Sequence, residues 1–105
     1  MLKKKQEENN MNTLENGITF GVDTERIYWN EKENLQTSVR FYLDFDELYM
    51  YEEYSGEALT IPEEGFTEIT YRDGVRFVIT MCYQDVTDLY KPFKAHVITK
   101  TLNKN

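Results

Sequence analysis

The most regular pattern of hydrophobic and polar positions lies between Leu35 and Phe45. Leucine, threonine, valine and phenylalanine occupy the odd positions of this segment, whereas glutamine, serine, arginine, tyrosine and aspartate occupy the even ones. A period of two residues is typical of a strand that turns one face to the core and the other to solvent. We therefore expect a half-buried strand over residues 35–45.

A second pattern predicts a β-hairpin. Residues 66–71 and 75–83 are rich in β-branched and aromatic side chains, and Arg72-Asp73-Gly74 separates the two runs. An Asp-Gly pair suits the positive φ angles of a tight type I′ turn, so we expect the runs to pair across it. The second run carries apolar residues on both faces, which predicts a central strand covered on both sides.

The rest of the chain carries weaker patterns. They predict further strands at residues 18–22, 26–29, 58–61 and 94–101. Residues 46–54 fit neither the period of a strand nor that of a helix. This segment stays open between a strand and a helix of one or two turns capped by Asp46.

These elements together predict a mostly β fold, with α+β as the alternative. We expect an antiparallel β-sandwich or small barrel of about six to seven strands with at most one short helix. Residues 1–13 are charged and polar without a useful period, which predicts a flexible N-terminal tail. Residues 14–105 are then expected to form a single domain, because a second core would have too few residues.

The composition of the chain indicates the cellular compartment in which we expect it. Cys82 is the only cysteine, so no disulfide can form within the chain. No apolar run follows the lysines near the N-terminus as it would in a signal peptide, and no stretch approaches the ~20 apolar residues of a membrane span. We therefore expect a cytoplasmic protein that acts away from membranes. Abundant Asn and Lys with only two alanines are typical of AT-rich genomes, such as those of some bacteria and phages.

The charge of the chain is strongly negative. Nineteen acidic residues face twelve Lys and Arg, and residues 11–99 hold seventeen acids against seven bases. Direct binding to nucleic acid requires a basic surface for the phosphates, so we do not expect it. The acidic balance favours a partner protein with a basic surface.

Candidate catalytic chemistry is sparse. His96 is the only histidine, which excludes a metal site built from several imidazoles within one chain. A dyad of Cys82 and His96 is formally open, but both residues fall on predicted strands where structural roles are the stronger interpretation. We predict no catalytic residue, no metal ligand and no cofactor, and therefore a protein that is not an enzyme.

Residues 41–71 combine negative charge with tyrosine. This segment has no Lys, Arg or His, nine acidic residues and five tyrosines. Tyrosine is enriched at binding hot spots, and acids steer a basic partner. The alternative is a solvated acidic face with part of the tyrosines in the core. The predicted partner-binding residues are Asp44, Asp46, Glu47, Tyr49, Tyr51, Glu52, Glu53, Tyr54 and Glu57.

No motif points to a particular family. In size and charge the chain resembles the small acidic proteins with which phages and mobile elements inhibit nucleases and other host defence proteins. That resemblance implies an anti-defence inhibitor, with nucleic-acid mimicry as one means of inhibition, acting as a monomer or small homo-oligomer in a bacterial or phage-infected host cell. The alternatives are a structural β module of a phage or mobile element, and a β-barrel that binds a small ligand or an enzyme without a visible motif.

Overall fold

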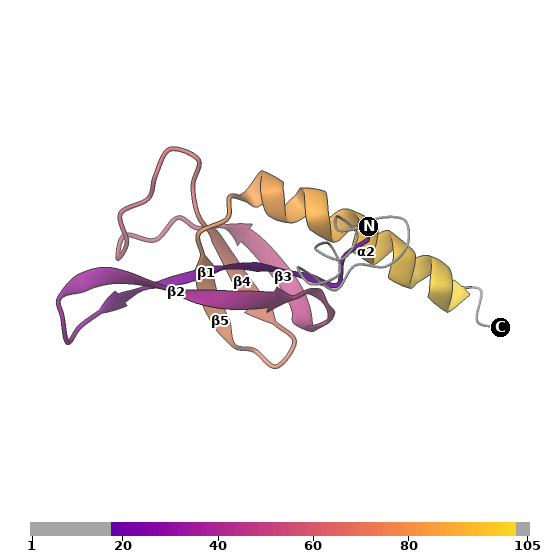
Figure 1. Cartoon of the computed structure of the whole chain (residues 1–105), viewed down its shortest axis with the longest axis horizontal. Helices are drawn as coiled ribbons and strands as arrows, with labels where there is room; N and C mark the ends of the chain where they lie inside the picture. Colours follow the sequence, from indigo (N-terminus) through magenta and orange to yellow (C-terminus); the bar gives the residue numbers. More distant parts are fainter. Residues whose placement is uncertain (1–17, 103–105) are drawn as a thin grey trace, which may run out of the picture.

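The computed structural model describes residues 18–102 and shows an open antiparallel sheet with one long helix (Figure 1). The strands lie in the order β2-β1-β5-β4-β3, so that β2 and β3 are the two edges. Their bounds are β1 Gly21–Asn30, β2 Leu35–Asp44, β3 Leu48–Glu53, β4 Thr67–Tyr71 and β5 Arg76–Ile79. A 3-10 turn, η2 (Phe45–Glu47), joins β2 to β3, and helix α2 (Tyr83–Leu102) follows β5. The tail predicted at residues 1–13 lies outside the described residues.

The period-two pattern of residues 35–45 is confirmed as β2, which pairs with β1 along its whole length. The burial of its apolar face is graded: Leu43 is fully buried, whereas Leu35 is 45% exposed. The reason is that β1 pairs with the central strand β5 only at Arg26 and Ile27. Beyond that point the β1–β2 hairpin extends past the rest of the sheet, as Figure 1 shows.

The predicted β4–β5 hairpin is confirmed, and β5 is the central strand. Its turn differs from the type I′ prediction, because within the turn only Gly74 has a positive φ, of 94°. The N–H of Gly74 donates to the carbonyl of Tyr71, and the N–H of Tyr71 donates to the carbonyl of Val75, both at 2.9 Å. This is a three-residue loop that ends in a left-handed glycine. The second strand ends at Ile79 rather than at residue 83.

The prediction of a strand at residues 94–101 is wrong, because this segment belongs to α2. Val86, Leu89, Tyr90 and Phe93 follow the helical spacing i, i+3, i+4, i+7, and all four pack against the main core. That packing outweighs the β-branched residues further along the helix, since most helical stability in proteins comes from tertiary contacts. The prediction of at most one short helix is wrong as well, because α2 has 20 residues.

The sandwich or barrel of six to seven strands is not what the chain forms. Residues 58–61 lie in a loop, and the strands predicted at 18–22 and 26–29 contribute to the single strand β1. With the last predicted strand in a helix, the described residues form one open sheet of five strands and no barrel interior. The coarser prediction of a mostly antiparallel β fold is confirmed.

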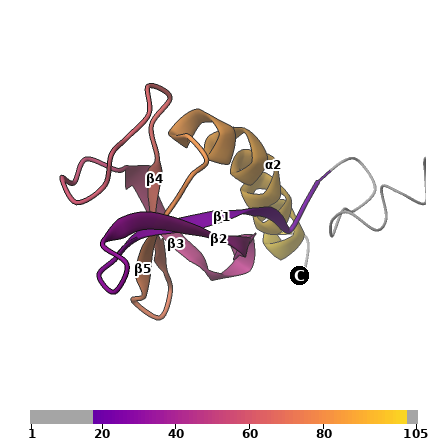
Figure 2. The ribbon, with the colours of Figure 1, turned by 60° about the vertical axis from the view of Figure 1, so that its left-hand side comes forward.

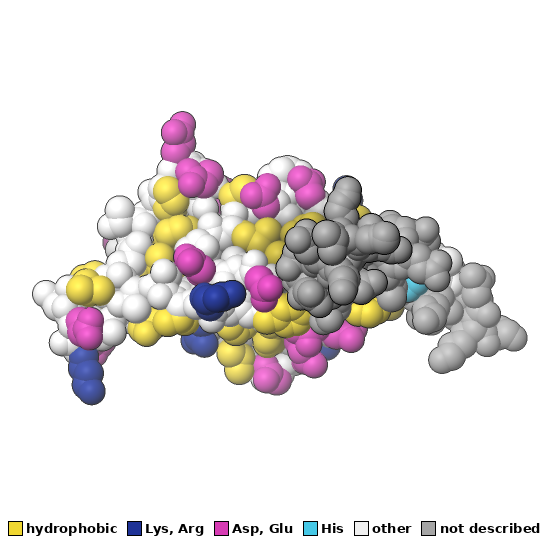
Figure 3. Space-filling model, viewed as in Figure 1, with side chains coloured by type: hydrophobic (Ala, Val, Ile, Leu, Met, Phe, Trp, Pro, Cys, Tyr) yellow, Lys and Arg dark blue, Asp and Glu magenta, His cyan; other side chains and the backbone are white. Residues whose placement is uncertain are grey.

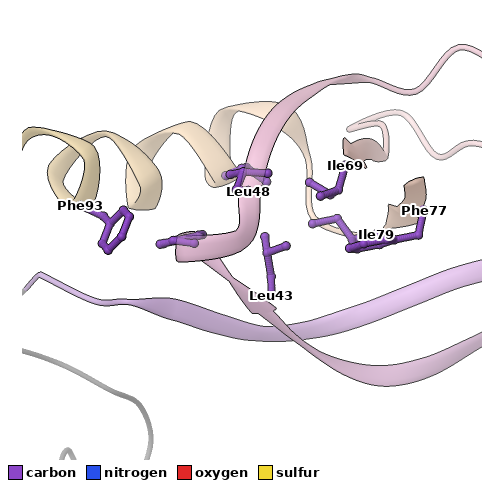
Figure 4. Close-up of a cluster of buried hydrophobic side chains, with 8 residues drawn as sticks. Leu43, Leu48, Ile69, Phe77, Ile79 and Phe93 are labelled. Carbon is purple, nitrogen blue, oxygen red and sulfur yellow. The ribbon is translucent and has the colours of Figure 1, made fainter. Parts of the chain in front are cut away.

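The two faces of the sheet are covered differently. On one face, α2 closes a core of eight buried residues, six of which are labelled in Figure 4. On the other face, Leu59 and Phe66 from the loop of residues 54–66 pack on Ile27. Figure 2 shows α2 on one side of the β4–β5 hairpin and this loop on the other. The members of the larger core are Leu43, Phe45, Leu48, Ile69, Phe77, Ile79, Val86 and Phe93.

Candidate partner-binding surface

The segment between β2 and β4 begins with a sharp change of direction. Asp44 accepts a hydrogen bond of 3.0 Å on its carboxylate from the N–H of Asp46, which caps the 3-10 turn η2. Phe45, the first residue of the turn, and Leu48, directly after it, are buried and hold the turn against the core. The ambiguity of residues 46–54 is thereby resolved as a short 3-10 turn followed by a strand, with Asp44 rather than Asp46 as the cap.

Strand β3 is an edge of the sheet. It pairs with β4, with Tyr51 opposite Ile69 and Glu52 opposite Glu68, and the N–H of Tyr54 donates to the carbonyl of Phe66 at 3.0 Å. In an antiparallel pair the hydrogen-bonding groups of successive residues point alternately toward and away from the neighbour. The backbone N–H and C=O of Tyr51 and Glu53 therefore point outward, away from β4.

The predicted acidic residues are distributed along this edge. Asp46 and Glu47 lie in η2 at one end of β3, Glu52 and Glu53 lie at the other end, and Glu57 lies in the loop beyond. These five side chains are exposed, whereas Asp44 is half-buried. The ion pair present among the described residues, at 3.3 Å between Arg76 and Glu68, involves none of the six. None of these six carboxylates is therefore held in that ion pair, and the guanidinium of Arg72 nearby donates to the carbonyl of Asp46 rather than to a carboxylate.

The three predicted tyrosine anchors do not share one face. Tyr51 faces α2, where it shares a hydrogen bond of 2.8 Å with Thr87. Tyr54 packs against the smaller core on the opposite face of the sheet. Tyr49 lies where the β3–β4 register shifts between residues 48 and 50, and it is 66% exposed. Of the three, Tyr49 has the most exposed ring. Tyr51 packs β3 against α2, and Tyr54 packs it against the smaller core on the opposite face.

Sequence reasoning missed the contribution of α2 to this surface. The rings of Tyr83 and Tyr90 contact Tyr51, tilted and edge-on respectively, with ring centroids 5.0 and 5.8 Å away. The ammonium of Lys94 lies 5.9 Å from the Tyr90 ring centre. An open hollow of about 350 Å³ is lined by Tyr49, Met50, Tyr51, Tyr83, Tyr90, Lys91 and Lys94. The helical spacing of Tyr83 and Tyr90 was the available signal, and the strand prediction at 94–101 obscured it.

A second open hollow, of about 340 Å³, lies at the start of α2. It is lined by Glu53, Glu64, Cys82, Tyr83 and Gln84. Because Tyr83 also lines the first hollow, the two are neighbours along the junction between β3 and α2. We call this pair of hollows the β3–α2 trough. Its lining carries two lysines at one end and two glutamates at the other.

The hydroxyl of Tyr71 lies close to the acidic residues near η2. It accepts a hydrogen bond of 3.1 Å from the N–H of Asp44. Burial, and then the nearby carboxylates of Asp44, Glu47 and Asp73, raise the pKa of Tyr71 above its usual value. The side chain therefore stays neutral throughout the physiological range, and its hydroxyl ties β4 to the start of the turn.

Other chemistry finds little support in the geometry. Cys82 directly precedes α2 and His96 lies fourteen residues further on, so their backbones are ~20 Å apart along the helix axis. Within residues 18–102, no group of three or more His, Cys, Asp or Glu side chains is arranged to hold a metal ion. None of the helical structure in the same part of the chain is long and apolar enough to cross a membrane.

Comparisons with protein-family models, with curated proteins and with solved structures find no match to this chain. The protein described so far is an open antiparallel sheet with one covering helix and an acidic edge strand at the helix side.

Proposed function

We propose that this chain is a non-enzymatic binding protein that inhibits a larger protein by docking the acidic β3 edge on a basic surface. The observation that carries the proposal is the combination of an edge strand with exposed carboxylates at both of its ends. A nuclease or another nucleic-acid-binding protein of the host fits this description, because its binding groove presents Lys and Arg to phosphates. Occupying that groove blocks it without any catalytic step.

The charge of the molecule supports the same function. On the face in Figure 3, acidic side chains are scattered from the upper to the lower margin among hydrophobic ones, and Lys and Arg side chains are fewer. A strongly negative protein approaches a basic partner faster than an uncharged one, and exposed apolar area then slows dissociation. Exposed Tyr49 and Met50, in the middle of the acidic edge, supply such area.

The same charges disfavour the alternative of a self-assembling structural module. Two copies that paired antiparallel through β3 would bring the acidic residues of η2 in one copy beside Glu52 and Glu53 of the other. Charged side chains on an edge strand are a common device against such pairing. An edge that repels its own copies while remaining open suits a partner of opposite charge.

The test is capture of partners from a host lysate by the immobilised protein, at about 20 mM and 500 mM salt. Its comparison variant carries Asp46→Lys, Glu47→Lys, Glu52→Lys and Glu53→Lys. Asp44 is left intact because it caps η2. We expect the wild type to retain a nucleic-acid-binding protein at low salt, to lose much of it at high salt, and the variant to retain at least tenfold less at low salt.

The control variant reverses Glu31 and Glu33 to Lys in the β1–β2 loop, far along the chain from β3. It should capture the partner as the wild type does. Equal capture by the wild type and the β3 variant at low salt would show that the acidic edge is only a solvated face. Circular dichroism on all three proteins confirms that each one is folded.

A further inference from the structure

The open edge of β3 and the trough beside it lie together. Tyr51 and Glu53 turn their backbone N–H and C=O groups away from β4, at the outer edge of the sheet. The side chains of the same two residues line the two hollows. An edge that presents free main-chain groups next to pockets is the arrangement used for recognition by strand addition.

The two ends of the β3–α2 trough carry opposite charges. Lys91 and Lys94 line the hollow that includes Tyr49, and Glu53 and Glu64 line the other. Tyr49 and Glu53 are four residues apart in β3, or ~13 Å along an extended chain. An added strand thus meets positive charge at one end and negative charge at the other, with tyrosine rings between.

We propose that β3 takes an extended segment of a partner protein as a sixth strand, and that the β3–α2 trough selects a segment with a basic and an acidic residue about four positions apart. This inference rests on the proposed function and names how the partner is held. The added strand runs antiparallel to β3, as every pair in this sheet does, because antiparallel pairing is the more stable. The basic residue then precedes the acidic one, since the N-terminal end of the segment lies at Glu53.

The charge of the edge explains why the occupant is a partner and not a second copy. An antiparallel pair of β3 strands places the acidic residues of η2 in one copy beside Glu52 and Glu53 of the other copy, at both ends of the pair. A partner with an overall basic surface has no such penalty, and the charge pattern of its segment matches the trough.

The probe is a synthetic nine-residue peptide of threonine with lysine at its third position, phenylalanine at its fifth and glutamate at its seventh. Its control has the lysine and the glutamate exchanged. Fluorescence anisotropy measures binding, and amide hydrogen exchange measures protection at Tyr51 and Glu53. We expect the lysine-first peptide to bind at least tenfold more tightly and to protect both amides. Reversing Lys91 and Lys94 to Glu should remove the difference between the two peptides.

A matched pair of variants isolates the main-chain hydrogen bond. Glu53→Ala and Glu53→Pro both lose the carboxylate, but only proline loses the outward N–H. Because that N–H makes no bond to β4, proline is tolerated there as it is at other sheet edges. We expect Glu53→Pro to bind the peptide at least tenfold more weakly than Glu53→Ala. A peptide that is N-methylated at the residues facing β3 tests the same main-chain hydrogen bonds with the wild-type protein. It should bind the wild type as weakly as the unmodified peptide binds Glu53→Pro.

Failure of this inference is separable from failure of the proposed function. No binding of the lysine-first peptide at 1 mM, taken here as about the weakest useful affinity, overturns strand addition. So does equal binding by Glu53→Pro and Glu53→Ala together with undiminished binding of the N-methylated peptide. In either case, partner capture that still depends on the acidic edge leaves the proposed function standing. Strand addition is then replaced by docking through side chains.

Discussion

Single residues decide where the strands of this sheet turn. Asp44 caps η2 with its carboxylate and donates its N–H to the Tyr71 hydroxyl, so one residue connects β2, the turn and β4. Gly74 closes the β4–β5 hairpin with a φ of 94°. A Cβ atom at Gly74 would meet no atom within 4 Å, so the cost of adding one there comes from the positive φ of the backbone.

Replacing Gly74 by valine should therefore lower the free energy of unfolding by about 1–2 kcal/mol, because a β-branched residue resists positive φ. Denaturant titration at neutral pH measures the change. Gly74→Asn is the matched control, since asparagine tolerates the left-handed region, and it should lose clearly less stability. Equal stability of the valine variant and the wild type would contradict the left-handed turn.

At the scale of elements, α2 covers one face of the sheet, as a second sheet does in a β-sandwich. Val86 and Phe93 are buried in the larger core, and the rings of Tyr90 and Phe93 contact Phe45. The helix does so with Pro92 near its middle. Proline has no N–H for the carbonyl four residues earlier, so one hydrogen bond of the helix is missing at this position.

Replacing Pro92 by alanine should raise the free energy of unfolding by about 2 kcal/mol. Proline in a helix interior costs ~3 kcal/mol, of which up to ~1 kcal/mol is offset by the loss of freedom that proline imposes on the unfolded chain. Thermal unfolding followed at 222 nm measures the gain. Lys91→Ala, the neighbouring exposed position, should change stability by less than about 0.5 kcal/mol. A less stable Pro92→Ala variant would mean that the core requires a bend at this position.

The whole molecule carries a formal charge of −7, and much of it is concentrated around one edge. Glu52 lies opposite Glu68 across β3 and β4, and Glu68 pairs with Arg76. That arrangement relieves only part of the repulsion along the edge. Self-repulsion of this kind weakens a folded protein, and salt reduces it by shortening the Debye length.

Raising the salt concentration from about 10 mM to 150 mM at pH 7 should therefore stabilise the protein by ~1 kcal/mol, or ~5 °C in Tm. Scanning calorimetry measures the shift. The variant with Asp46, Glu47, Glu52 and Glu53 reversed to Lys changes the formal charge by eight units, from −7 to +1. Its Tm should respond less to salt. A wild-type Tm that is independent of salt would show that the acids are too far apart to interact.

Several features of the fold and of the candidate surface could be predicted from the sequence because they are local. The alternation at residues 35–45 depends only on the geometry of a strand, and the Asp73-Gly74 pair depends only on which residues accept positive φ. The concentration of acids between residues 41 and 71 is likewise visible without coordinates. Strand β2, the β4–β5 hairpin and the charge of β3 follow from these patterns.

Other features required the tertiary structure because they depend on contacts distant in sequence. Packing against Phe45 and Leu48 makes residues 83–102 a helix despite the β-branched residues near its end. The pairing of β3 with β4 separates Tyr51 from Tyr54, and the course of α2 brings Lys91 and Lys94 beside Tyr49. Local chemistry thus determines the strands and the charge of the edge, whereas burial of the shared core decides which side chains meet along it.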